Sequence, residues 1–217
     1  MDTLTRFVCA CKTSQDGRKL FFKQEFQEII LDSCDKEMLL QAFLFFNIDR
    51  FFPEYTNILM YEQTPDLSDA TQSGKCDFVY ISKARRVMII ETKFIDYNHF
   101  GPTARKRRNN HRQKVVNQSV DFRAKLSRQW SIPIEIIDCS IFTTEDLNYR
   151  EKNNNIISKY ISIEDLNTWH QEEKKRIQIA QLINRELMIN LFTCEHCPTA
   201  DVCYESNICF LDMGDGD

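Results

Sequence analysis

Two short stretches decide the fold of this chain: residues 74–81 (GKCDFVYI) and residues 87–93 (VMIIETK). Both are rich in apolar, β-branched and aromatic residues, and the short polar segment that joins them predicts a β-hairpin. Asp77, Glu91 and Lys93 stand inside these apolar runs, although charged side chains are rare in buried strands unless they are paired or functional. The hairpin therefore carries the candidate functional site.

The spacing of the two stretches predicts the register of the hairpin. A turn centred near Ala84 pairs residues whose numbers sum to about 168, so Asp77 falls opposite Glu91. Directly opposed residues of an antiparallel pair lie about 5 Å apart at Cβ, and two carboxylates there repel each other unless a cation lies between them. Mg²⁺ prefers carboxylate, water and phosphate oxygens, and Lys93 returns to the face that carries Glu91. The pattern predicts a divalent-metal site with two acids and one base.

Two acids and a lysine around a divalent ion suit the hydrolysis of a phosphodiester bond. The metal activates water and neutralises charge on the phosphate, while the lysine orients the water or stabilises the transition state. The order Gly74, Asp77 and Glu91-Thr92-Lys93 on a strand, turn and strand resembles the core of the PD-(D/E)XK nuclease superfamily. This resemblance implies a nuclease that uses Mg²⁺ or Mn²⁺, with Asp77 and Glu91 as metal ligands and Lys93 as the residue that positions the attacking water.

The resemblance suggests two further site residues. Members of the superfamily often carry a Q-x-x-x-Y motif on the helix after the E-x-K strand, and Gln118 with Phe122 matches it in part. A solvated glutamine one turn from a packed phenylalanine is the alternative. Many members also carry an acid on a helix upstream of the first strand, for which Glu37 is the best candidate, with Glu25 and Glu28 as rivals.

Positive charge is concentrated shortly after the hairpin, although the whole chain has a formal net charge of −4 at pH 7. The basic residues of this segment are Arg105, Lys106, Arg107, Arg108, Arg112 and Lys114. Next to a nuclease-like hairpin, such a cluster predicts a track that binds DNA phosphates in a salt-dependent manner. A solvated basic helix face or a localisation tag is the alternative.

Cysteine spacing is the second distinctive feature of the chain, which has nine cysteines. Cys194, Cys197 and Cys203 have the spacing of a metal knuckle that, with one more ligand, holds a [4Fe-4S] cluster or Zn²⁺. The pattern resembles the iron–sulfur branch of the same superfamily, found in CRISPR-associated exonucleases and AddB-type helicase-nucleases. That resemblance implies a fourth cysteine ahead of the nuclease core, which Cys9 or Cys11 could supply.

Other assignments of the thiols stay open at this point. Cys209 or His196 offers a local ligand, the latter for zinc, and unliganded thiols are a further alternative. Cys34, Cys76 and Cys139 lie among apolar neighbours and are expected to be buried small residues.

Hydrophobic periodicity predicts an α/β protein. Helices are expected over residues 21–31, 36–46, 105–128 and from a capping motif at 162–165 to about 192, and strands over 55–61, 76–81, 87–94, 134–142 and 159–161, with another short strand around Cys9 and Cys11. An apolar stripe on the last helix, including Leu166 and Ile183, is expected to face the core. This order suits a restriction-endonuclease-like central mixed β-sheet flanked by helices, with a long C-terminal helix and a Cys-rich tail.

Length and composition favour one domain. A chain of 217 residues with 42% hydrophobic content can bury a substantial core. We expect a nuclease domain over residues 1–193 and a Cys-rich tail over 194–217 that packs on it. Because no apolar run is long enough for a membrane span and the first residues lack a signal pattern, we expect an intracellular protein, cytoplasmic or nuclear.

The predicted function is Mg²⁺-dependent hydrolysis of DNA. Any unwinding would require a helicase or other processing partner, because the chain has no helicase motif. The alternative is a catalytically inactive nucleic-acid-binding or zinc-stabilised interaction module, in which Asp77 and Glu91 merely pair with arginine or lysine. No residue distinguishes DNA from RNA or endonuclease from exonuclease, although the iron–sulfur resemblance favours an exonuclease.

Overall fold

The computed structural model describes residues 1–15, 18–67, 74–98, 100–147 and 156–192. It divides into two units, Met1–Glu172 and Glu173–Asp217, and every strand among the described residues lies in the first. The predicted Cys-rich tail lies outside the described residues. Within the described residues, no helix is both long enough and apolar enough to cross a membrane.

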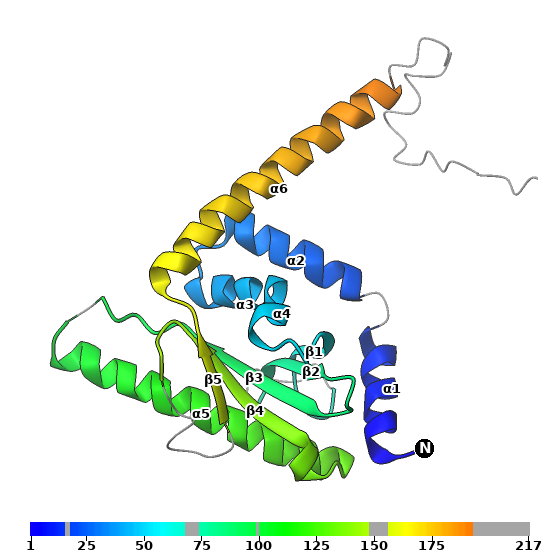
Figure 1. The fold of residues 1–217 in the computed structure, drawn as a ribbon, viewed down its shortest axis with the longest axis vertical. Helices are drawn as coiled ribbons and strands as arrows, with labels where there is room; N and C mark the ends of the chain where they lie inside the picture. Colours follow the sequence, from blue (N-terminus) through cyan, green and yellow to red (C-terminus); the bar gives the residue numbers. More distant parts are fainter. Residues whose placement is uncertain (16–17, 68–73, 99, 148–155, 193–217) are drawn as a thin grey trace, which may run out of the picture. The chain divides into compact units, whose positions relative to one another are not determined.

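A five-stranded mixed sheet forms the centre of the first unit, with its strands in sequence order (Figure 1). The strands β1 (Asn57–Gln63), β2 (Cys76–Ile81) and β3 (Val87–Lys93) form an antiparallel meander, and β4 (Ile137–Thr143) and β5 (Ile156–Tyr160) continue the sheet in parallel. Parallel neighbours need a crossover, and a long helix between β3 and β4 supplies it.

The hairpin of β2 and β3 has the predicted register. Phe78 pairs with Ile90 and Ile81 with Val87, so the next step of the ladder places Asp77 opposite Glu91. The turn is closed by the backbone N–H of Ser82, which donates to the carbonyl of Arg86.

Helices cover both faces of the sheet in the first unit. The helices are α1 (Thr3–Gln15), α2 (Arg18–Asp32), α3 (Lys36–Phe46), α4 (Ile48–Phe51) and α5 (Pro102–Trp130), and α6 (Ile163–Phe192) begins here and continues into the second unit. On one face, α1 and α5 bury apolar side chains such as Phe7 and Phe122 against Val79 and Ile89. Aromatic rings from α2 and α3 pack on the other face, where Phe26 contacts Phe78. The predicted α/β class and restriction-endonuclease-like architecture are confirmed.

Local capping fixes where two of the helices begin. The side chain of Asp35 accepts hydrogen bonds from the backbone N–H groups of Glu37 and Met38, at 2.7 and 3.3 Å, which satisfies two donors that the helix cannot pair internally. This cap places Glu37 in the first turn of α3. The predicted capping motif of α6 is also present, because Ser162 Oγ accepts from the backbone N–H of Asp165.

Four expectations about the fold were wrong. The strand expected over residues 134–142 begins only at Ile137, because Ile134–Ile136 form a short 3-10 helix. The residues around Cys9 and Cys11 form helix α1 rather than a strand, because Leu4, Phe7 and Cys11 recur at helical spacing and are buried together. Cys34 is exposed, in the link between α2 and α3, whereas Cys76 and Cys139 are buried as predicted. Leu166 on α6 is fully buried, but Ile183 is 50% exposed and does not belong to a core stripe.

Phe43 tests the aromatic packing on the α3 face. Its side chain is 1% exposed and its ring contacts those of Phe51, Phe142 and Trp169. We expect Phe43→Ala to lower the free energy of unfolding by about 3–5 kcal/mol, because it leaves a cavity in a close-packed core. Urea unfolding measures the loss, and Met38→Ala on the exposed side of the same helix should lower it by less than about 1 kcal/mol. Similar losses in both variants would contradict this packing.

Candidate active site

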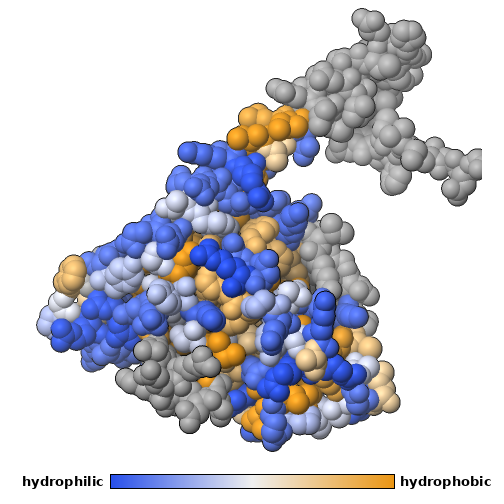
Figure 2. All heavy atoms as spheres, in the orientation of Figure 1, coloured by the Kyte–Doolittle hydropathy of each residue, from blue (hydrophilic) through white to orange (hydrophobic). Residues whose placement is uncertain are grey.

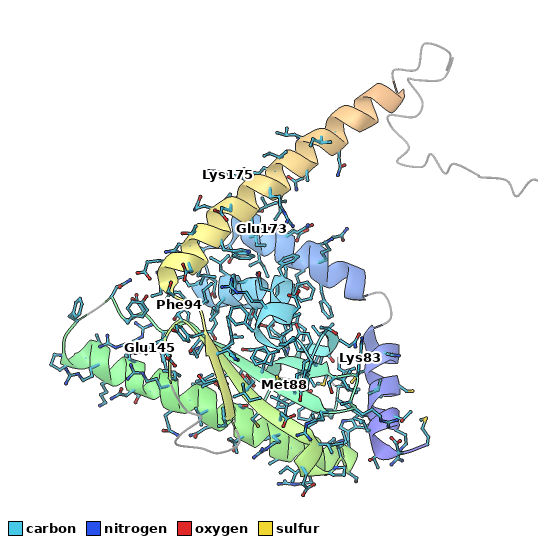
Figure 3. All side chains as sticks on the ribbon, viewed as in Figure 1. Lys83, Met88, Phe94, Glu145, Glu173 and Lys175 are labelled. Atoms are coloured by element: carbon cyan, nitrogen blue, oxygen red, sulfur yellow. The ribbon has the colours of Figure 1, made fainter. Side chains whose placement is uncertain are left out.

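The candidate site lies where β3 ends. Lys93, the last residue of β3, pairs in register with Thr143, the last residue of β4. Figure 3 labels Lys83 and Phe94 at opposite ends of the hairpin, and the candidate residues belong to the end marked by Phe94 and Glu145. The side chains of the site come from the adjacent strands β2 and β3 and from helix α3.

The carboxylate of Asp77 is held by the residue between Glu91 and Lys93. Its Oδ2 accepts a hydrogen bond from the backbone N–H of Thr92 at 2.7 Å and another from Thr92 Oγ1 at 2.6 Å. Both donors converge on one oxygen, so the orientation of the carboxylate is fixed. No feature of the sequence pattern marked Thr92 for this role.

The acidity of Asp77 is strongly perturbed. Burial raises its pKa to about 6, and the nearby negative charges of Glu37 and Glu62 contribute to this, although the two hydrogen bonds from Thr92 act in the opposite direction. A carboxyl group with this pKa ionises more readily when a cation is bound beside it.

Glu91 is the most constrained acid of the site. Its side chain is 3% exposed, and its Oε1 is buried without a hydrogen-bond partner among the described residues. Burial and then the charge of Asp77 raise the pKa of Glu91 well above its ordinary value. An unsatisfied buried carboxylate oxygen costs about 1–3 kcal/mol or more, and either a proton or a bound cation removes this cost.

The arrangement of these acids fits a magnesium ion. Among the residues that the structure describes, no group of three His, Cys, Asp or Glu side chains is placed to hold a metal ion. Mg²⁺ is commonly bound by one or two carboxylates, with water and substrate phosphate at the other positions, so Asp77 and Glu91 offer a sufficient protein ligand set. The observation that favours this fit is the oxygen of Glu91 for which the described residues provide no hydrogen-bond partner.

Lys93 is held by Glu37 from across the fold. Lys93 Nζ lies 2.7 Å from Glu37 Oε1 and 2.5 Å from Glu37 Oε2, and the two side chains are 16% and 35% exposed. The cap of α3 delivers Glu37 to this position. The structure thus brings together four of the predicted site residues, Glu37, Asp77, Glu91 and Lys93.

Helix α5 contributes a histidine that the sequence analysis did not select. Arg107, His111, Lys114 and Gln118 share one helical face by their spacing. Burial lowers the pKa of His111, the positive charges of Lys93 and Arg107 lower it further, and Glu37 opposes this effect, so His111 lies within the electrostatic field of the site. Its spacing from Arg107 and Gln118 was the signal that could have identified it. Gln118 is exposed on this face, and its role stays a prediction.

Two clefts adjoin the beginning of α5. The first, of about 490 Å³, is lined in part by Lys36, Phe94, Arg107 and His111. The second, of about 590 Å³, is lined in part by Arg105, Lys106, Asn109 and Asn110. Phe100 and Arg108 line both clefts. Figure 2 shows a largely hydrophilic surface over this end of α5.

The basic residues of α5 are not equivalent. Arg112 donates to Glu145 from Nε at 3.0 Å and also from its terminal nitrogen, and it donates to Asn109 as well. Its charge is therefore partly neutralised within the protein. Arg105, Lys106, Arg107 and Lys114 are exposed, and Arg108 is partly buried; DNA binding by any member of the segment stays a prediction.

The structure describes only the N-terminal candidates among the predicted cysteine ligands. Cys194, Cys197 and Cys203 lie outside the described residues. Cys9 is exposed on α1, whereas Cys11 is buried and burial raises the pKa of its thiol to about 12. Since the thiolate is the form that binds metals, Cys9 is the better placed of the two N-terminal candidates.

Comparisons with known proteins find only weak structural similarity. No known family profile matches the chain, and no characterised protein matches its sequence. Two solved structures are similar: the EndoMS–dsDNA2 complex, at 11% identity and a TM-score of 0.37, and a repair endonuclease from Pyrococcus abyssi, at 13% identity and a TM-score of 0.38. The alignments cover 60% of this chain but only 48% and 49% of those chains. We therefore derive the function from this chain's own residues.

Asp77→Asn tests the electrostatics of the site. The pKa of Asp77 is about 6 in the folded protein and 3.8 ordinarily, so its contribution to stability is fully present below about pH 4 and is lost as the pH rises through 6. In EDTA near pH 7, we expect Asp77→Asn to be more stable than the wild type by about 1–3 kcal/mol, and the difference should vanish near pH 4. Urea unfolding at the two pH values measures it.

Asp138→Asn is the matched control, and its effect on the free energy of unfolding should have the opposite sign. Burial acts to raise the pKa of Asp138, but hydrogen bonds from Arg86 and Tyr55 lower it overall. This variant should therefore be less stable than the wild type at neutral pH, with the deficit shrinking as the pH falls. An Asp77→Asn protein that is destabilised at pH 7 would contradict the raised pKa of Asp77 and the burial that causes it.

Proposed function

We propose that this protein is a Mg²⁺-dependent nuclease that hydrolyses phosphodiester bonds in DNA. The observation that carries the proposal is the buried oxygen of Glu91, which has no hydrogen-bond partner within the described part of the chain and lies beside the carboxylate of Asp77, whose pKa is raised. Lys93 stands next to this pair, and the cationic clefts of α5 open beside it. Hydrolysis of a phosphodiester bond needs acids that hold a metal ion, a cation near the reacting phosphate and a surface that binds the nucleic-acid backbone.

Each residue has a role that follows from its contacts. Asp77 and Glu91 would hold Mg²⁺, or alternatively Mn²⁺, which supplies an activated water and neutralises phosphate charge. Thr92 fixes the orientation of Asp77. The ammonium group of Lys93 has three donors, so it can contact Glu37 and still donate to the attacking water or to a phosphate oxygen.

Glu37 acts on the reaction through Lys93. The ion pair restrains the flexible side chain of Lys93, so the ordering of Lys93 precedes substrate binding. Glu37 could also accept a hydrogen bond from a metal-bound water, with Gln118 as a further candidate to help hold the attacking water. The basic residues between Arg105 and Lys114 would bind the DNA backbone.

The alternative is an inactive module that keeps the fold. In such a module, Asp77 and Glu91 would be neutralised by arginine or lysine. The two hydrogen bonds recorded for Asp77 Oδ2 instead come from Thr92, and the lysine of the site pairs with Glu37. These contacts favour the enzyme, because they leave the two acids available to a cation.

Cleavage of labelled DNA tests the proposal. We expect Mg²⁺-dependent degradation by the wild type, and we expect Lys93→Ala to lower the rate by about 100-fold or more, because it removes a preorganised donor to the reacting phosphate or water. Asp77→Ala should abolish metal-dependent cleavage without unfolding the protein. Lys83→Ala, at the turn end of the same hairpin, is the matched control and should cleave at the wild-type rate. Full activity in Asp77→Ala would refute the assignment.

The cysteine pattern extends the proposal to a second metal. We propose that Cys194, Cys197 and Cys203 bind a [4Fe-4S] cluster with Cys9, or alternatively Zn²⁺, and a cluster would favour an exonuclease that works with a helicase partner. The exposure of Cys9 supports it as the N-terminal ligand.

Metal content after anaerobic purification tests this extension. A cluster predicts iron, sulfide and a brown colour in the wild type, and Cys9→Ser should lose the visible absorbance while Cys34→Ser, another exposed cysteine, keeps it. Zinc without iron would identify the other metal. If the wild type contains neither iron nor zinc, both the cluster and the zinc version of the proposal are wrong.

A further inference from the structure

We propose that the cleft beside Lys93 binds an unpaired nucleotide, with the ring of Phe100 as the surface on which its base stacks. The proposal rests on the nuclease function above and deepens it by naming the substrate class: single-stranded or frayed DNA rather than a continuous duplex. It is carried by the exposure of Phe100, the charges around it and the position of the cleft.

Phe100 is exposed to an unusual degree. Its side chain is 90% exposed, although burying a phenylalanine is worth about 1.5–3 kcal/mol. It lies directly before α5, where Gly101 adopts a φ of 113° and Pro102 begins the helix. A glycine in that conformation and a proline with restricted φ define how the chain enters the helix next to this ring. An exposed aromatic ring on a defined backbone suits base stacking.

Cationic side chains line both clefts that share Phe100. The cleft toward Lys93 is lined by Lys36, Arg107 and Arg108, together with the imidazole of His111, and Asp96 is the acidic residue among its lining. Lys36 Nζ lies 5.1 Å from the centroid of the Phe94 ring, so this lysine is already oriented over the cleft wall. A polyanion with aromatic bases matches this combination, since cations bind its phosphates and rings bind its bases.

The cleft adjoins the segments that carry two of the candidate catalytic residues. Lys36 precedes Glu37, Phe94 follows Lys93, and the pKa of His111 is affected by both members of that ion pair. A cavity of about 490 Å³ is in the range that encloses one small ligand, which corresponds to a single nucleotide. A base in the interior of a duplex cannot present its face to Phe100, because its stacked neighbours cover both of its faces. The cleft therefore selects unpaired nucleotides.

The second cleft extends the same track away from the site. It shares Phe100 and Arg108 with the first, and it adds Arg105 and Lys106. Neighbouring phosphates of a single strand could thus follow α5 from one cleft to the other. Phe100 stands at the junction, where its ring can separate the two clefts or support a base between them.

Binding measurements test this proposal independently of catalysis. Fluorescence anisotropy in Ca²⁺, with a labelled oligothymidylate and a blunt duplex of matched length, compares the wild type with Phe100→Ala, Phe100→Tyr and Ile134→Ala. We expect Phe100→Ala to weaken single-strand binding by about 5- to 100-fold and to leave duplex binding within about 2-fold, because one stacking partner is lost. Phe100→Tyr should bind like the wild type. Ile134→Ala, which truncates a 42% exposed apolar residue just before β4, is the control and should also bind normally.

Photo-crosslinking gives a second readout. Oligonucleotides with 5-iodouracil, irradiated and mapped by mass spectrometry, should crosslink to Phe100 and lose the adduct in Phe100→Ala. Equal affinity of Phe100→Ala and the wild type for the single strand, or adducts only on other segments, would overturn the proposal. Tighter Phe100-dependent binding of oligouridylate would overturn the assignment to DNA.

The outcomes separate this inference from the function on which it rests. If the wild type cleaves DNA with Mg²⁺ and Phe100→Ala behaves identically on both substrates, the inference fails and the nuclease stands. If single strands bind through Phe100 but no metal supports cleavage, the nuclease fails and the stacking site stands.

Discussion

Two carboxylates placed opposite each other in a mostly apolar hairpin are the constraint on which the candidate site depends. The register of β2 and β3 brings Asp77 and Glu91 together, and burial raises the pKa of both. Without a cation, the folded protein must protonate these groups or bear their repulsion. Such a cost is typical of a site arranged for a function rather than for stability.

The rest of the fold restrains this pair from several directions. Thr92 orients Asp77 from within the same hairpin, and Glu37 holds Lys93 from the first turn of α3. The strands are packed on both faces, so these side chains cannot relieve their repulsion by moving the backbone. Preorganisation of this kind is the main source of electrostatic catalysis, because the site does not reorganise when charge develops.

The surface around the site is electrostatically different from the chain as a whole. A net charge of −4 does not favour binding to DNA, but α5 concentrates positive charge beside the clefts. Local charge is what a phosphate experiences at distances shorter than the Debye length, which is about 8 Å at physiological ionic strength. The ion pair of Arg112 with Glu145 shows that part of this charge also stabilises the fold, by joining α5 to the segment after β4.

The sequence by itself determined the features that depend on local periodicity and short spacing. Turn length and alternation predicted the register of the hairpin and the α/β class. Periodicity and capping residues predicted the limits of α3 and the beginning of α6. All of these signals act between residues that are close in sequence. The choice of Asp77, Glu91 and Lys93 as candidates followed from charges placed in apolar strands.

Only the tertiary structure decided which distant residues meet this hairpin. Glu37 and Lys93 are 56 positions apart, and their contact depends on how α3 packs against the sheet. His111, the clefts around Phe100 and the partner of Arg112 likewise depend on where α5 crosses the strands. The helical spacing of Leu4, Phe7 and Cys11 was present in the sequence, but only the tertiary structure shows that this face of α1 is buried against α5 and the sheet. Packing between elements is cooperative and long-range, so patterns within one segment cannot specify it.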